Sequence, residues 1–146
     1  MDERKPELSY RLLTDRANGG RPMLCVTREP PERVARRHPM AGAEHRWLIG
    51  GNGRGSVNPN RLDGVFGLID GFVRARPNGV VLLDGIELLM IMNSYEEVRA
   101  FLCGLQTLLL RNATDCVIPI DTRTLTSKEL AEMRTAFPMI RGAAAD

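Results

Sequence analysis

Carboxylate side chains follow an unbroken apolar run near the middle of the chain. Residues 80 to 87 read Val-Val-Leu-Leu-Asp-Gly-Ile-Glu, so Asp84 ends the run and Glu87 follows three residues later. A run of leucines and β-branched residues without polar alternation is typical of a strand buried on both faces. We therefore expect Asp84 to emerge at the carboxyl end of a central strand, which is the edge at which open α/β sheets bind ligands.

Acidic residues also follow two other predicted strands. Glu29 comes just after one of them and Asp121 ends another, so both join Asp84 and Glu87 at the same edge if the sheet is parallel. Carboxylate oxygens are ligands that Mg²⁺ prefers in proteins. Asp84, Glu87 and Glu29 are therefore the catalytic candidates, and Asp84 and Asp121 are the candidate metal ligands.

A purely structural role for the same aspartates is the favoured interpretation. Aspartates after strands often accept hydrogen bonds from loop amides and fix a turn. Arg28 and Arg123 lie just past strand ends, so each could form an ion pair with Asp84 or Asp121 and close the site without a ligand. Gly85 follows Asp84 directly and permits a turn conformation that other residues avoid.

A glycine-rich stretch from Gly50 to Ser56 has part of the spacing of a phosphate-binding loop. The position of the essential lysine holds Ser56, and the position of the metal-binding hydroxyl holds Val57, so the charge that neutralises phosphates is missing. A mobile surface loop is the preferred interpretation, and a weak anion site remains the alternative. Its candidate residues are Arg54, Gly53, Gly55 and Arg28.

Composition indicates one soluble globular domain. The chain has 146 residues, of which 43% are hydrophobic and 26% charged. Its longest apolar stretch, Val80 to Met92, is too short to span a bilayer, and its charged start is unlike a secretory signal, so we expect a cytoplasmic product without a membrane partner. Cys25, Cys103 and Cys116 lack metal-ligand spacing, which predicts reduced, buried thiols.

A basic cluster extends from Arg33 to Arg46 and includes both histidines. The net charge of +2 does not by itself imply a nucleic-acid partner. A solvated helix face followed by a loop is the simpler explanation. Nucleic-acid binding through this cluster, which would depend strongly on salt, is therefore the weakest of the functional alternatives.

Strand-like and helix-like segments alternate along the chain, which predicts an α/β fold. We expect a three-layer sandwich with a mainly parallel, five-stranded sheet and helices on both faces. The strand-like segments are residues 9–14, 23–27, 46–49, 80–84 and 115–121.

Local signals mark several element ends. Capping boxes at Ser94–Glu97 and Thr126–Glu129 predict helix starts. Pro119 predicts that the last strand is an edge or ends near Ile118. A single domain spans 8–140, with flexible ends at 1–7 and 141–146.

The order of these segments resembles the uncharacterised archaeal family known as domain of unknown function 835, over residues 8 to 137. The resemblance is carried by Leu24-Cys-Val-Thr-Arg28, by Trp47-Leu-Ile with Val57-Asn-Pro59, by Val81-Leu-Leu-Asp-Gly-Ile-Glu-Leu-Leu89 leading to Asn93, and by Ile118-Pro-Ile-Asp121. That family in turn resembles the RecA and KaiC group of ATPases, which implies a reduced RecA-like P-loop NTPase core lacking the phosphate loop.

The RecA-like resemblance carries functional expectations. Asp84 looks like the carboxylate of the ATPase metal site, and Glu29 like the acidic residue that serves hydrolysis. Where those ATPases have a phosphate loop and a long helix, this chain has only residues 16–22. We therefore expect a non-catalytic regulatory or interaction module that binds another protein or itself, with a homo-oligomer left open. A nucleotide-binding switch or ATPase that uses ATP and Mg²⁺ is the alternative.

Overall fold

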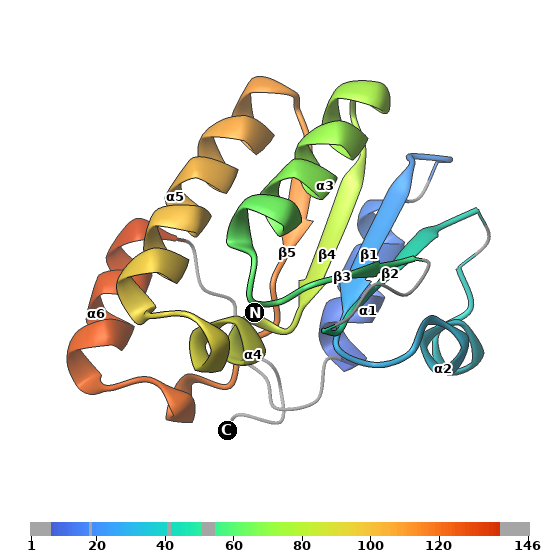
Figure 1. Cartoon of the computed structure of the whole chain (residues 1–146). Helices are drawn as coiled ribbons and strands as arrows, with labels where there is room; N and C mark the ends of the chain where they lie inside the picture. Colours follow the sequence, from blue (N-terminus) through green and yellow to red (C-terminus); the bar gives the residue numbers. More distant parts are fainter. Residues whose placement is uncertain (1–6, 18, 41, 51–54, 138–146) are drawn as a thin grey trace.

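The computed structural model describes residues 7–17, 19–40, 42–50 and 55–137. The predicted flexible end 141–146 and residues 1–6 of the other predicted end lie outside them. Figure 1 shows the elements coloured along the chain. In order they are α1 (Glu7–Arg16), β1 (Met23–Thr27), α2 (Pro31–Arg37), β2 (Glu44–Leu48), β3 (Ser56–Val57), α3 (Leu62–Ala75), β4 (Val80–Asp84), α4 (Ile86–Met92), α5 (Tyr95–Arg111), β5 (Asp115–Val117), the 3₁₀-helix η1 (Thr122–Thr124) and α6 (Ser127–Ala136).

The five strands form one parallel sheet in the order β3-β2-β1-β4-β5. The chain builds outward from β1 through β2 to β3, then returns to the other side of β1 and builds outward through β4 to β5. The direction of winding therefore reverses between β1 and β4. In open α/β sheets a crevice forms at this switch point, outside the carboxyl ends of the strands.

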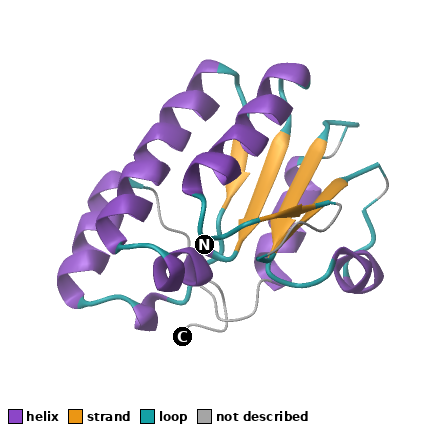
Figure 2. Cartoon of the chain, viewed as in Figure 1, coloured by secondary structure: helices purple, strands orange, loops and turns teal. Residues whose placement is uncertain are grey.

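Helices cover both faces of the sheet, which confirms the predicted three-layer sandwich (Figure 2). Successive residues of a strand point to opposite faces, so β1 and β4 divide their side chains between two cores. Leu24, Val26, Val81 and Leu83 pack in the core formed with α3 and α5. The intervening residues of these strands pack in the smaller core beneath α1 and α2. All five residues of β4 are buried, as its unbroken apolar run predicts.

The prediction of a strand at residues 9–14 is wrong, because this segment lies within α1. Tyr10, Leu13 and Ala17 recur at spacings of three and four, which places them on one side of a helix. All three are buried in the core beneath α1 and α2. The fifth strand is instead β3, which pairs with the outer edge of β2.

Local signals at the helix and strand ends are confirmed. Both capping boxes form, with the Ser94 hydroxyl accepting from the Glu97 amide at 3.1 Å. β5 is an edge strand that ends at Val117, two residues before Pro119. In the described part of the chain, none of the helices combines the length and apolar character that crossing a membrane requires.

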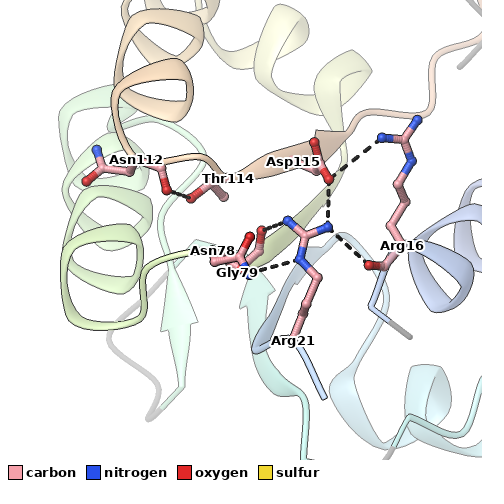
Figure 3. Close-up of polar contacts among 7 residues, drawn as sticks. All are labelled: Arg16, Arg21, Asn78, Gly79, Asn112, Thr114 and Asp115. Carbon is pink, nitrogen blue, oxygen red and sulfur yellow. Dashed lines mark hydrogen bonds and ion pairs between the residues drawn. The ribbon is translucent and has the colours of Figure 1, made fainter. Parts of the chain in front are cut away.

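Arg21 closes the amino edge of the sheet, opposite the switch point (Figure 3). Its guanidinium donates to the carbonyl oxygens of Asn78 at 2.9 Å, Gly79 at 3.0 Å and Arg16 at 3.1 Å. It also contacts the Asp115 carboxylate at 2.8 Å. One side chain thus joins the end of α1, the turn before β4 and the start of β5, using the fork of donors that only arginine offers.

Arg21→Ala should therefore lower the free energy of unfolding by about 2–3 kcal/mol, because it removes one donor from each of three carbonyl oxygens and the nearer cation from the Asp115 carboxylate. Urea denaturation measures this loss. Arg11→Ala is the matched control, since Arg11 is exposed on α1 and makes no hydrogen bond or ion pair to the described residues. We expect the control to change stability by less than about 0.5 kcal/mol. Equal effects of the two substitutions would contradict the role given to Arg21.

The two histidines lie beside the smaller core. His38, which follows α2, stacks on Tyr10 of α1 with ring centroids 4.0 Å apart and planes 4° from parallel. Burial and the neighbouring Arg37 lower the pKa of His38, against the opposing effect of nearby carboxylates. Burial also lowers the pKa of His45 on β2. Both imidazoles therefore favour the neutral form in the folded protein.

Stability should decrease as the pH falls through 6.5, the pKa of an unperturbed histidine. The folded-state pKa values lie below 6.5, so the unfolded chain binds protons first and the loss continues until the folded values are passed. Chemical denaturation between about pH 7.5 and about pH 5.5 measures the slope. We expect the His38→Gln/His45→Gln variant to show a flatter profile, and an unchanged slope would refute this assignment.

Candidate functional site

The switch point is closed by an ion pair between the ends of β1 and β4. Thr27 and Asp84 are register partners on these strands, and the Arg28 amide donates to the Asp84 carbonyl at 2.9 Å. The Asp84 side chain is only 3% exposed, and its Oδ1 lies 3.5 Å from Nε of Arg28. A carboxylate so far removed from water requires a nearby positive charge or hydrogen-bond donors. Arg28 supplies that charge, as the structural interpretation of Asp84 predicted.

Backbone contacts hold the turn that carries Arg28. The Thr27 hydroxyl donates to the Glu29 carbonyl at 2.8 Å. The Trp47 indole, from the end of β2, donates to the Arg28 carbonyl at 3.2 Å. These bonds fix the direction in which the chain leaves β1, and with it the position of the guanidinium over the end of β4.

Gly85 makes the turn after Asp84 in a conformation that requires glycine. Its φ is 154°, and a Cβ placed there would lie 2.7 Å from Cδ2 of Leu48. The turn leads directly into α4, a helix that the sequence analysis did not predict. The sequence analysis assigned no element to residues 86–92, because a short apolar run does not distinguish a strand from a helix.

Glu87 and Asp121 meet beside α4 in a second polar cluster. One carboxylate oxygen of Glu87, Oε1, accepts from the Asp121 amide at 2.8 Å. Asp121 in turn accepts from the Arg123 amide at 3.1 Å and from the Arg123 guanidinium at 2.9 and 2.7 Å. These contacts cap η1 and fix the path from β5 to α6. The predicted pairing of Asp121 with Arg123 is therefore confirmed.

The other oxygen of Glu87, Oε2, is buried and has no hydrogen-bond partner among the described residues. A carboxylate oxygen without a donor is costly to bury, so it marks a place where a ligand, a water or a cation could bind. No group of three or more His, Cys, Asp or Glu side chains in the described ranges is arranged to hold a metal ion. Glu87 is thus the candidate with an open acceptor, whereas Asp84 is paired with Arg28.

The remaining candidates are dispersed. Glu29 pairs with Arg37 of α2 at 3.4 Å rather than with another carboxylate. Gly55 lies in the turn before β3 with a φ of 75°, and its carbonyl accepts from the Trp47 amide at 2.9 Å. Gly53 and Arg54 lie outside the described residues. The structure therefore joins Arg28 with Asp84 and Glu87 with Asp121, but it does not join Glu29 to either pair.

The basic cluster is partly neutralised by acids within the fold. Arg37 pairs with Glu29, and Arg46 lies 3.9 Å from Glu44 of the same strand. Arg33 and Arg36 remain exposed on α2. The surface that a phosphate backbone would meet is therefore less positive than the count of arginines indicates.

Cys103 contradicts the prediction of three buried thiols. Cys25 is buried and Cys116 is half-buried, and burial raises the pKa of each thiol to about 12. Cys103 is instead exposed on the outward side of α5. The segment around it is apolar because the opposite side of α5 faces the core. The prediction for Cys103 used the apolar composition of this segment and did not use the position of Cys103 off the apolar stripe.

Gly85→Ala should lower the free energy of unfolding by about 2–4 kcal/mol, because the new methyl group collides with Leu48 and strains the turn. Thermal or urea unfolding measures the change. Gly50→Ala is the matched control in the same neighbourhood, since a Cβ there meets no atom within 4 Å and φ is not positive. A Gly85→Ala protein as stable as the control would show that the turn relaxes without cost.

Comparison with known proteins identifies a family without a described activity. The family model described as "Protein of unknown function (DUF835)" matches residues 2–137. No curated protein and no solved structure matches the chain. Because the match covers nearly the whole chain, this protein belongs to the DUF835 family.

Proposed function

We propose that the protein is a non-catalytic regulatory or protein-interaction module whose fold is a reduced RecA-like core with a degenerate nucleotide site. The observation that carries this proposal is the Arg28–Asp84 ion pair across the switch point. In a nucleotide-hydrolysing site the carboxylate at this edge holds Mg²⁺ against the phosphates. Here its negative charge is already compensated by a side chain of the same fold.

The second polar cluster supports the same role. Glu87 accepts from the Asp121 amide, and Asp121 binds Arg123 and caps η1, so these carboxylates position loops. A partly buried network of this kind sets geometry more than it adds stability. Acidic residues that maintain the loop geometry at the carboxyl edge favour a scaffold over a catalyst.

A nucleotide-binding switch or ATPase with ATP and Mg²⁺ remains the second candidate. It is favoured by the buried Glu87 oxygen without a partner, Oε2, and by its position near a switch point. In this alternative Glu87 would bind the metal through that oxygen. Asp84 would exchange Arg28 for the metal when nucleotide binds.

Titration calorimetry with ATP and Mg²⁺, combined with a phosphate-release assay, distinguishes the candidates. We expect no phosphate release above background, because the charge that would hold the metal is paired within the fold. Micromolar binding together with phosphate release would overturn the proposal. Asp84→Asn and Glu87→Gln, each checked for folding by circular dichroism, serve as matched variants: a true ATPase loses hydrolysis in at least one of them, whereas contaminating activity does not change.

A further inference from the structure

The fully exposed residues over the central turns of α5 carry no charge, and the nearest charged residue, Arg99, is half-exposed toward α6. The residues that α5 exposes there are Ala100, Cys103, Gly104, Thr107 and Leu110. Leu110 is 78% exposed. The contrast with α2 is sharp, because the exposed side of that helix includes Glu32, Arg33, Arg36 and Arg37. Uncharged surface at the centre of a patch is a property of protein interfaces.

α3 extends this surface beside α5 (Figure 1). An open groove between the two helices is lined by Phe66, Asp70, Arg74, Thr107 and Arg111. Gly67 and Gly71 of α3 are exposed, and a Cβ at either position would meet no atom within 4 Å. Without side chains on this ridge, another helix can approach the backbone closely. We name the surface formed by the outward sides of α3 and α5 the α3–α5 face.

Opposite charges mark the two ends of the α3–α5 face. The helices run in the same direction, since Phe66 contacts Phe101 in their amino halves and Arg74 shares the groove with Arg111 at their carboxyl ends. Glu96 and Asp63 lie exposed at the amino end. The carboxyl end presents Arg111, and neither this arginine nor those two acids forms an ion pair with the described residues. The face is thus acidic at one end and basic at the other.

We propose that the α3–α5 face binds a second copy of this chain through a two-fold axis, with the two α5 helices antiparallel. We place the two-fold axis between Cys103 and Gly104. At a rise of 1.5 Å per residue, Glu96 and Arg111 then lie about 11 Å from this axis along the helix, in opposite directions. Arg111 of each copy then faces Glu96 of the other. A two-fold interface requires this self-complementarity, because the same patch serves both subunits. The inference rests on the proposed interaction role and names its partner.

Sedimentation velocity over a range of protein concentrations tests the interface. We expect a dimer whose dissociation constant rises at least about tenfold in Thr107→Arg and in Arg111→Glu, because each places charge against the opposite copy. The double variant Arg111→Glu/Glu96→Arg should recover most of the lost affinity, since it exchanges the two signs. Arg36→Glu, a charge reversal on the exposed side of α2, is the control and should leave the dissociation constant unchanged.

Thiol cross-linking locates the axis independently. A short bismaleimide should join two copies through Cys103, which is the exposed cysteine, and Cys103→Ser should abolish the product. A monomer at every concentration would overturn the inference, and so would a dimer that neither Thr107→Arg nor Arg111→Glu weakens. Either result leaves the non-catalytic role standing, because that role is tested separately by phosphate release.

Discussion

The burial of β4 on both faces is the constraint on which the rest of the structure depends. A strand covered on both sides carries Asp84 at its end into a region almost without water. A carboxylate there needs compensation, and the neighbouring strand provides it through Arg28. The position of Arg28 is in turn set by parallel pairing of β1 with β4 and by the bonds that hold the turn after β1.

Charged side chains close both edges of the sheet around this strand. At the amino edge Arg21 donates hydrogen bonds to carbonyl oxygens of the turn before β4 and forms an ion pair with the Asp115 carboxylate of β5. At the carboxyl edge Asp84 and Asp121 each have an arginine partner. The two aspartate–arginine pairs at the carboxyl edge contribute modestly to stability but fix loop geometry. This use of carboxylates is the physical basis of the interaction module proposed above.

Charged side chains are distributed differently on the outer helix surfaces than at the edges of the sheet. A solvent-exposed helix usually carries charges on its outward side, as α2 does. In the central groove of the α3–α5 face the charges of Asp70 and Arg74 pair with each other at 2.7 Å, and opposite charges lie at the two ends of the face. This distribution suits association through a two-fold axis. The core side of α5 packs against the sheet, and its outward side is exposed among the described residues.

Local patterns in the sequence were sufficient for much of the fold. The apolar run from Val80, the capping box at Ser94 and the position of Pro119 depend on neighbouring residues, so they predicted a buried strand, a helix start and an edge strand correctly. The prediction of a strand from Ser9 to Thr14 was wrong, because its short apolar pattern is compatible with both a strand and a helix. Only the packing of Leu13 and Ala17 against the sheet identifies the helix.

The sequence by itself determined the α/β class, the parallel sheet and which carboxylates follow strands, since these depend on composition and periodicity. Only the tertiary structure decided the pairing of those carboxylates. Arg28 and Asp84 are far apart along the chain and meet because β1 and β4 are adjacent in the sheet. The same holds for Glu87 and Asp121, because strand order and helix packing bring these distant residues together and no local pattern encodes their contact.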